Sequence, residues 1–151
     1  MDKKFMQEAI NEALKAYGLR EIPIGAVIVR NGEIVGRGYN LKETLKDATL
    51  HAEISAIRDA CKNLGGWRLP GCTMYVTLEP CAMCAGALVN ARVERLVIGT
   101  KDYKTGACGS VLNIVQMENL NHQIEVEFGV LENECTNMLK EFFVELRKFK
   151  K

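Results

Sequence analysis

The stretch GAVIVRNGEIVGRGY, residues 25–39, carries the strongest fold signal in this chain of 151 residues. It contains two short runs of β-prone residues, 25–30 and 33–39, with Asn31-Gly32 between them. Asn and Gly both tolerate positive φ, so this dipeptide between two apolar runs predicts a β-hairpin. We therefore expect the sheet of this protein to begin with an antiparallel pair of strands.

Helical and strand patterns alternate around this hairpin. Apolar residues recur at helical spacing over residues 3–17, and in a second predicted helix Ile54, Ile57, Cys61 and Leu64 share the face that we expect to be buried. The elements predicted after the hairpin are helices over residues 50–64, about 80–90 and about 130–149, and strands over residues 73–78, 95–99 and 123–128. Helices interleaved with five strands predict an α/β fold, a three-layer α/β/α sandwich whose five-stranded mixed sheet is covered on both faces.

Composition is that of an ordinary globular protein, with 48% apolar and 26% charged residues. No apolar run approaches the roughly 20 residues of a membrane span, and the N-terminus lacks the apolar core of a signal peptide. We therefore expect a cytoplasmic protein without a membrane partner. The length predicts a single domain over residues 1–151.

Charge is balanced overall but uneven along the chain. Twenty basic and nineteen acidic residues give a net charge of +1, which by itself predicts no polyanionic partner. Residues 105–139 hold five glutamates and no Lys or Arg, whereas residues 140–151 hold five basic residues and two glutamates. Residues 86–104 also hold four basic residues and two acidic ones. Together these two basic segments are a candidate phosphate-facing patch, although a solvated helix end is the simpler interpretation.

The cysteines point to a metal site. Of the six, only Cys81 and Cys84 are closely spaced, and residues three apart share one face of a helix, so the two thiols can bind one ion. His51, at the start of the preceding predicted helix, offers a third donor. One imidazole and two thiolates suit Zn²⁺ and leave a fourth position for water, which is typical of catalytic zinc sites.

A catalytic zinc site also needs a general acid and base, and Glu53 is the candidate. Positions i and i+2 on an ideal helix lie roughly 200° apart. His51 and Glu53 can therefore face one site only if both lie at the helix end. Two alternatives remain, namely a redox Cys-x-x-Cys pair and a structural zinc site that recruits Cys72 or Cys108 as fourth ligand.

The combination of His51-Ala52-Glu53 with Pro80-Cys81-Ala82-Met83-Cys84 is the signature of zinc nucleobase deaminases. Beyond it, the sequence resembles the bacterial tRNA-specific adenosine deaminases, in the cytidine deaminase-like zinc superfamily, over about residues 5–148. The stretches that carry the resemblance are residues 77–87 (the metal helix), 101–110 (the substrate-side loop), and 22–27 with 38–40 (the first hairpin).

This resemblance implies a cytidine deaminase-like homodimer that hydrolyses adenosine to inosine at the wobble position of a tRNA anticodon and releases ammonia. It implies that His51, Cys81 and Cys84 hold one zinc ion per subunit. Zinc-bound hydroxide would attack adenine C6 while Glu53 shuttles protons. Asn40 matches the family's asparagine that hydrogen-bonds the target nucleotide, although a turn residue that ends the hairpin is the alternative.

Four more residues are candidates for contacts with flanking nucleotides of RNA; no DNA is expected. Asp102 and Lys104, in the loop at 101–110, would contact ribose and phosphate, and Phe143 and Arg147, on the last helix, would stack on and clamp the anticodon. Their simpler roles are solvated loop charges, a core phenylalanine and a cation at a helix end. The segment 41–50 departs from the family pattern and predicts nothing.

Two other functions stay open from the sequence. One is a deaminase of free nucleobases or nucleosides such as guanine or cytosine, because the zinc motif is common to both kinds of enzyme. The loop at 99–110 and the basic last helix favour a polynucleotide instead. The other is a non-catalytic RNA-binding zinc subunit, against which Glu53 argues because a structural site needs no carboxylate beside its metal.

Overall fold

The hairpin predicted at residues 25–39 forms one edge of the sheet in the computed structural model, which describes residues 1–149. Strands β1 (Gly25–Arg30) and β2 (Glu33–Tyr39) pair antiparallel. Both turn residues have positive φ, 52° at Asn31 and 76° at Gly32, as the Asn-Gly signal requires. The hairpin prediction is confirmed.

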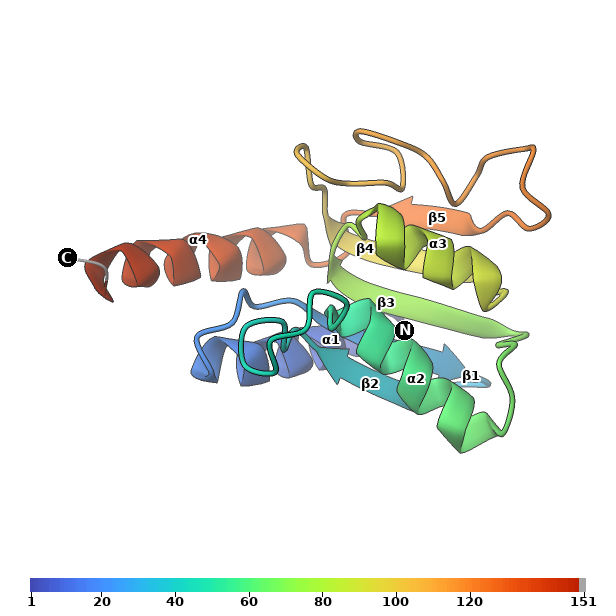
Figure 1. Ribbon diagram of the computed structural model, residues 1–151, viewed down its shortest axis with the longest axis horizontal. Helices are drawn as coiled ribbons and strands as arrows, with labels where there is room; N and C mark the ends of the chain where they lie inside the picture. The colour runs from blue at the N-terminus through green and yellow to red at the C-terminus, as the bar shows by residue number, and fades with distance from the viewer. Residues whose placement is uncertain (150–151) are drawn as a thin grey trace.

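Three further strands complete the sheet, in the order β2-β1-β3-β4-β5 (Figure 1). Strand β3 (Cys72–Leu78) runs antiparallel to β1, and β4 (Arg95–Thr100) and β5 (Glu125–Phe128) follow it in parallel. The sheet is therefore mixed and five-stranded, as predicted. Because β3 and β4 are parallel, the loops that follow them leave the sheet at the same end.

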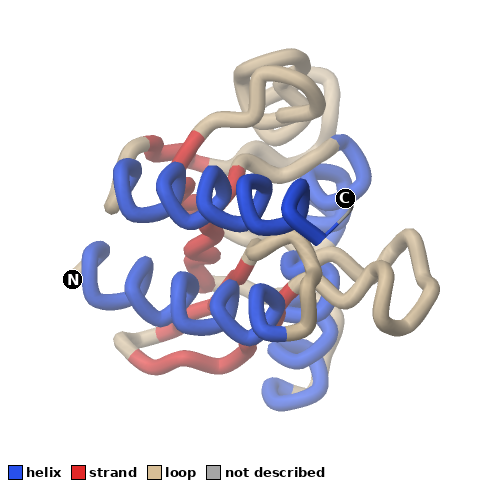
Figure 2. Tube along the Cα trace, turned by 90° about the vertical axis from the view of Figure 1, so that its left-hand side faces the viewer, coloured by secondary structure: helices blue, strands red, loops and turns tan. Residues whose placement is uncertain are grey.

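Four helices cover the two faces of this sheet (Figure 2). Helices α1 (Asp2–Gly18) and α4 (Glu132–Phe149) lie on one face, and α2 (Ala52–Leu64) and α3 (Ala82–Asn90) lie on the other. Each face has its own apolar core, and alternate residues of one strand enter different cores, with Val27 and Val29 on the α1 side and Ile28 on the α2 side. The three-layer prediction is confirmed.

Helix α2 packs on the sheet through a different face from the one predicted. Its fully buried residues are Ala52, Ala56 and Ala60, whereas Ile54, Ile57, Cys61 and Leu64 are only half-buried. The alanines lie directly on Gly36 and Gly38 of β2, where an added Cβ would collide with the helix backbone. The small residues bring helix and strand so close that the larger side chains flank the contact instead of filling it.

Helix α4 extends beyond the sheet (Figure 1). Only Cys135, Met138 and Phe142 are buried along it, so the rest of the protein covers only part of the apolar side of this helix. Its outer half lies against α1, where Tyr17 meets Phe142 edge to face at 5.5 Å and the Arg20 guanidinium lies 4.0 Å from the centre of the Phe149 ring. Lys150 and Lys151, which contribute to the basic end, lie outside the described residues.

Candidate metal and substrate site

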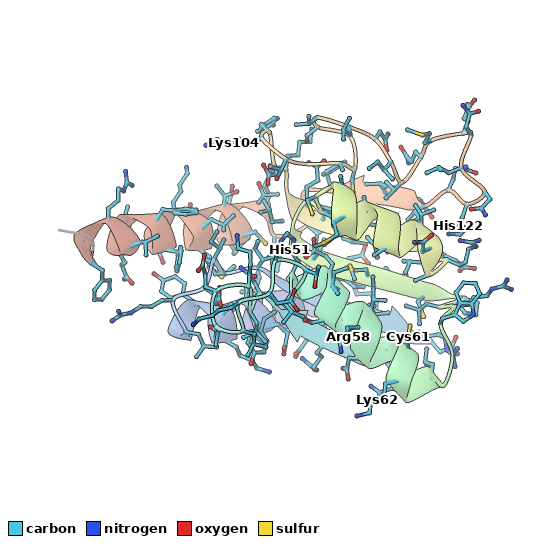
Figure 3. The ribbon with its side chains drawn as sticks, in the orientation of Figure 1. His51, Arg58, Cys61, Lys62, Lys104 and His122 are labelled. Atoms are coloured by element: carbon cyan, nitrogen blue, oxygen red, sulfur yellow. The ribbon has the colours of Figure 1, made fainter. Side chains whose placement is uncertain are left out.

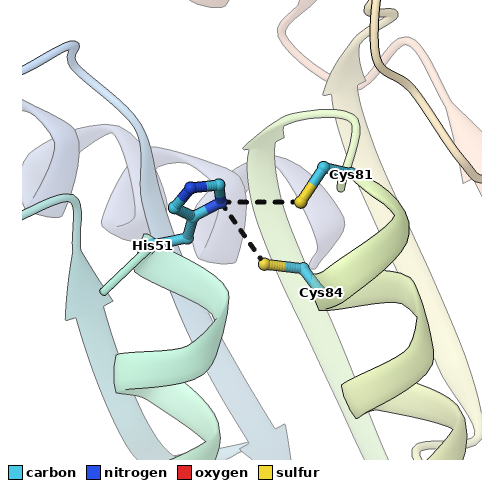
Figure 4. A group of neighbouring side chains, drawn as sticks. All are labelled: His51, Cys81 and Cys84. Atoms are coloured by element: carbon cyan, nitrogen blue, oxygen red, sulfur yellow. Dashed lines mark hydrogen bonds between the residues drawn. The ribbon is translucent and has the colours of Figure 1, made fainter. Parts of the chain in front are cut away.

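Three metal-binding side chains meet where α2 and α3 begin (Figure 4). The Nδ1 atom of His51 lies 3.6 Å from the Sγ atom of Cys81 and 3.6 Å from that of Cys84. All three possible ligand atoms lie within 4.8 Å of one another. The residues that the sequence singled out are thus brought together, and the cluster can hold one metal ion.

The backbone at the two helix starts explains this convergence. His51 is the N-cap of α2 and Cys81 the N-cap of α3, both with extended φ/ψ, so neither is a helical residue. Helix α3 begins at Ala82, two residues later than the predicted start at about residue 80, so Cys81 caps the helix and only Cys84 lies inside it. A side chain at an N-cap projects at the open end of its helix, and here the two helix starts lie side by side, so His51 points across to the cysteines.

Glu53 is buried beside this cluster. Its side chain is at the second position of α2, only 3% of the residue is exposed, and its Oε1 atom has no hydrogen-bond partner among residues 1–149. Because His51 is a cap in extended conformation, the ideal 200° separation does not apply, and both residues line one cavity of about 70 Å³ together with Cys81. That volume accommodates one or two water molecules of roughly 30 Å³ each.

Ionisation in the cluster is strongly shifted. Hydrogen bonds from Cys84 and His51 lower the pKa of Cys81 to about 3, while the neighbouring Cys81 sulfur and burial raise the pKa of Cys84. The Cys81 sulfur also raises the pKa of His51, and burial raises that of Glu53 to about 7. These shifts favour the thiolate at Cys81, the form in which a cysteine binds a metal ion, and binding of a divalent cation would displace the Cys84 proton.

The two alternative fourth ligands lie outside the cluster. The Cys108 sulfur is buried 4.0 Å from the carbonyl oxygen of Pro80, and the Cys72 thiol donates to the Pro70 carbonyl at 3.7 Å. His122, the other histidine of the chain, has Nε2 2.7 Å from the Val93 carbonyl oxygen, far from His51 (Figure 3). The donor set within residues 1–149 is therefore His51, Cys81 and Cys84.

A larger cavity of about 630 Å³ opens next to the cluster. His51 and Cys81 lie in its wall, together with residues from the segment before β1, the segment after β2, the end of β3, the loop after β4 and helix α4. Four of the five residues predicted to contact RNA line this cavity: Asn40, Asp102, Lys104 and Phe143. Arg147 does not; it lines an adjoining cavity of about 460 Å³ with Lys101, Lys140 and Phe143.

Asn40 and Asp102 use their side chains to shape the backbone of the cavity wall. The Asn40 amide donates to the Ile22 carbonyl oxygen at 3.3 Å and accepts from the Lys42 N–H at 3.2 Å. The Asp102 carboxylate accepts from the backbone of Lys104 and from Thr105. Partial burial of Asp102 opposes its ionisation, but these hydrogen bonds outweigh burial and lower its pKa.

Several residues of the cavity wall were not predicted from the sequence as site residues. Tyr103, 79% exposed, and Lys42 both line the cavity. An aromatic residue in a polar, glycine-bounded loop was the available sign for Tyr103. Lys42 lies in the segment 41–50, which predicted nothing. That segment is held by the buried carboxylate of Glu21, which accepts from the N–H groups of residues 43 and 44.

Comparisons with known proteins agree with this site. The model of the MafB19-like deaminase family matches residues 1–147. A tRNA-specific adenosine deaminase of Bacillus subtilis is 57% identical over 150 residues, which cover 99% of this chain and 93% of that protein. A structure from a study of tRNA:A34 deaminases, which edit A to I at the wobble position, superposes with a TM-score of 0.86 at 44% identity and covers 89% of this chain and 98% of its own. The guanine deaminase of Bacillus subtilis superposes with a TM-score of 0.63 at 29% identity, with 91% of each chain covered.

Fold and site together define the class: the protein has the cytidine deaminase-like fold and belongs to the MafB19-like deaminases. Within residues 1–149, no helix is long and apolar enough to cross a membrane. The identity and the coverage then place the chain more narrowly. It is a member of the tRNA-specific adenosine deaminase family.

Proposed function

We propose that this enzyme deaminates adenosine to inosine at the wobble position of a tRNA anticodon loop. The observation that carries the proposal is the position of Glu53, a buried carboxylate with a free Oε1 atom beside a metal-binding triad and at the base of an open cavity. The homologues named tRNA-specific adenosine deaminase and the A34 deaminase structure support tRNA as the substrate. The extruded base of a loop nucleotide would enter the larger cavity of about 630 Å³, whose wall includes His51 and Cys81, without the cost of opening a duplex.

The donor set fits zinc. One imidazole nitrogen and two sulfurs are ligands that Zn²⁺ prefers, and three protein ligands leave one position open. A zinc ion held by His51, Cys81 and Cys84 would supply an activated water for attack on adenine C6. We therefore propose one zinc ion per chain as cofactor.

Glu53 is the proposed proton carrier. Glu53 lines the same small cavity as His51 and Cys81, and its Oε1 atom has no partner among residues 1–149, so a water and the edge of the base would both lie within its reach. The carboxylate would take one proton from the water and deliver it to adenine N1. It would then take the second proton from the new hydroxyl on C6 and pass it to the amine, which leaves as ammonia. Burial raises the pKa of Glu53 to about 7, which suits a group that must both accept and donate a proton at neutral pH.

The five other residues that the sequence singled out are proposed to hold the RNA. Asn40 and Asp102 would contact the target nucleotide and its ribose from opposite walls of the cavity, and Lys104 a phosphate. Phe143, 41% exposed, lines the substrate cavity and its neighbour, so a flanking base can stack on it. Arg147 would then bind a phosphate outside the substrate cavity.

We also propose a homodimer that assembles through α3. The outer side of this helix carries small residues, with Ala82 exposed and Gly86 and Ala87 half-exposed, beside the exposed Met83 and Asn90. A Cβ added at Gly86 would meet nothing within 4 Å. Such a surface allows close approach of a second helix. A single deaminase domain over residues 1–151 and a cytoplasmic location, where tRNA is modified, complete the proposal.

The test is a direct assay. The purified protein is incubated with an anticodon stem-loop that carries A at the wobble position, and inosine is quantified after digestion. Free adenosine, cytidine and guanine run in parallel, with Glu53→Gln as the blank. We expect inosine from the stem-loop alone, and a loss of about 10³-fold in turnover for Glu53→Gln with metal retained, because general acid–base catalysis contributes roughly 10²–10⁴-fold. Ammonia from a free base, without inosine in the RNA, would overturn the proposal in favour of a small-molecule deaminase.

A further inference from the structure

Glu79 is a buried carboxylate to which the site described above assigns no role. It follows directly after β3, and only 2% of the residue is exposed. Its Oε1 atom accepts from the Asp102 N–H at 3.1 Å and from the Ser110 hydroxyl, and its Oε2 atom accepts from the N–H groups of Cys108 and Ser110 at 3.0 and 3.1 Å. All four donors belong to the loop 101–110.

The backbone next to Glu79 is joined to the same loop. The Glu79 N–H donates to the Thr100 carbonyl oxygen at 2.9 Å, and the Pro80 carbonyl oxygen accepts from the Ala107 N–H at 2.9 Å. Cys81, a residue of the metal-binding triad, comes next in the chain. Three consecutive residues thus join the substrate loop to the metal cluster.

Little else connects this loop to the rest of the protein by hydrogen bonds. Among the described residues, its other hydrogen bonds stay within the loop and its continuation to Ile114, apart from those to Pro80. The loop also closes tightly on the carboxylate, because a Cβ added at Gly106 would lie 2.5 Å from Glu79 Oε2. Ala107 and Cys108 also pack in the apolar core, but among hydrogen bonds to side chains outside the loop, those to Glu79 are the ones that hold it.

We propose that Glu79 is a positioning residue that sets the distance between the metal cluster and the loop carrying Asp102 and Lys104. Four hydrogen bonds to one carboxylate fix the loop before substrate arrives, so binding need not order it. The role of this loop in binding RNA rests on the proposed function. The attachment of the loop to Glu79 does not depend on it.

Glu79→Gln removes some of the hydrogen bonds between residue 79 and the loop and keeps others, because an amide has only one oxygen that can accept. If the amide oxygen takes the Oε2 position, it still accepts from Cys108 and Ser110, but the amide nitrogen then faces the Asp102 N–H, donor against donor. The opposite orientation loses the bonds to Cys108 and Ser110 instead. The matched control is Glu12→Gln, because Glu12 is equally buried at 2% exposure but binds Lys15 and Arg37 on the α1 side of the sheet.

The experiment compares the zinc-loaded wild type with both variants. Deamination kinetics on the stem-loop, metal content and amide hydrogen exchange are measured well below the melting temperature. For Glu79→Gln we expect a rise in KM of about tenfold or more with one metal per chain retained, and faster exchange of the loop amides while α2 and α3 exchange as before, because small misplacements cost up to about 10²-fold. Glu12→Gln should lower thermal stability but leave KM and loop exchange unchanged.

Three results would overturn the proposal: wild-type loop exchange in Glu79→Gln, a fall in kcat alone that matches a loss of folded protein, and the same KM rise in Glu12→Gln. If Glu79→Gln fails to fold, Ser110→Ala removes one donor and should raise KM in the same direction by a smaller factor; an unchanged KM then overturns the proposal. A wild type that makes no inosine refutes the proposed function instead, and hydrogen exchange still decides whether Glu79 holds the loop.

Discussion

The Asp2 carboxylate ties the first turn of α1 to the sheet, and its loss should cost stability in a pH-dependent way. Asp2 accepts two hydrogen bonds from the Arg95 guanidinium, at 2.9 and 2.8 Å, and one from the Tyr75 hydroxyl at 2.7 Å. Arg95 also pairs with Glu127 on β5. The perturbation is Asp2→Asn, which keeps the shape of the side chain and removes its charge.

The magnitude follows from the pKa of Asp2. Hydrogen bonds from Arg95 lower this pKa from 3.8 to about 2, and each pKa unit corresponds to about 1.4 kcal/mol, so the ceiling is about 2.5 kcal/mol. The Arg95 and Asp2 side chains are 27% and 29% exposed, so solvent screening reduces the expected loss to about 1 kcal/mol. Because the folded pKa lies below the unfolded one, this stabilisation is complete above pH 3.8 and is lost as the pH falls through about 2.

The free energies of unfolding of the wild type and of Asp2→Asn are measured with urea from pH 7 down to pH 3. Metal-dependent contributions that are common to both proteins cancel in the difference between the two values. We expect the difference to shrink toward pH 3 and at high salt. Glu127→Gln is the control, because the Glu127 side chain is 51% exposed and its loss should cost less. A pH-independent difference, or an equal loss for Glu127→Gln, would refute this reasoning. Turnover should be unchanged, since Arg95 pairs with Thr73 at the end of the sheet away from the metal cluster.

Two further predictions concern the site. Cys81→Ser should weaken metal binding by more than the roughly 10–100-fold that is typical when a residue supporting a metal ligand is replaced. Metal analysis after dialysis measures this loss. If the variant retains one tightly held metal ion per chain, the proposed ligand set is wrong. Phe143→Ala should raise KM for the stem-loop roughly 10–100-fold, since stacking of a base on an aromatic ring is worth about 1–3 kcal/mol, while the melting temperature changes little. An unchanged KM for the stem-loop would remove Phe143 from the RNA contacts.

Helix α4 shows that an element can be predicted correctly while the burial of its individual side chains cannot. Its period and its length were readable, and a helix forms over residues 132–149. Its apolar side, however, extends past the sheet, so Phe142 is buried against Tyr17 of α1 while Phe143 stays 41% exposed at the edge of the cavity. Which of two adjacent aromatic residues enters the core depends on where the sheet ends, and local periodicity does not contain that information.

The sequence by itself determined the local elements and the donor chemistry. The hairpin at residues 25–39 follows from Asn31-Gly32, which needs only positive φ, and the metal triad follows from residue types that bind a borderline cation. Both depend on properties of single residues or close neighbours, which the order of amino acids states directly.

Only the tertiary structure decided how distant segments meet. The close packing of α2 on Gly36 and Gly38, which placed alanines in the core, depends on the opposing strand. The attachment of loop 101–110 to Glu79 and of segment 41–50 to Glu21 joins residues more than twenty positions apart. A buried carboxylate is stable there only because backbone N–H groups from another part of the chain reach it, and that condition exists only once the chain has folded.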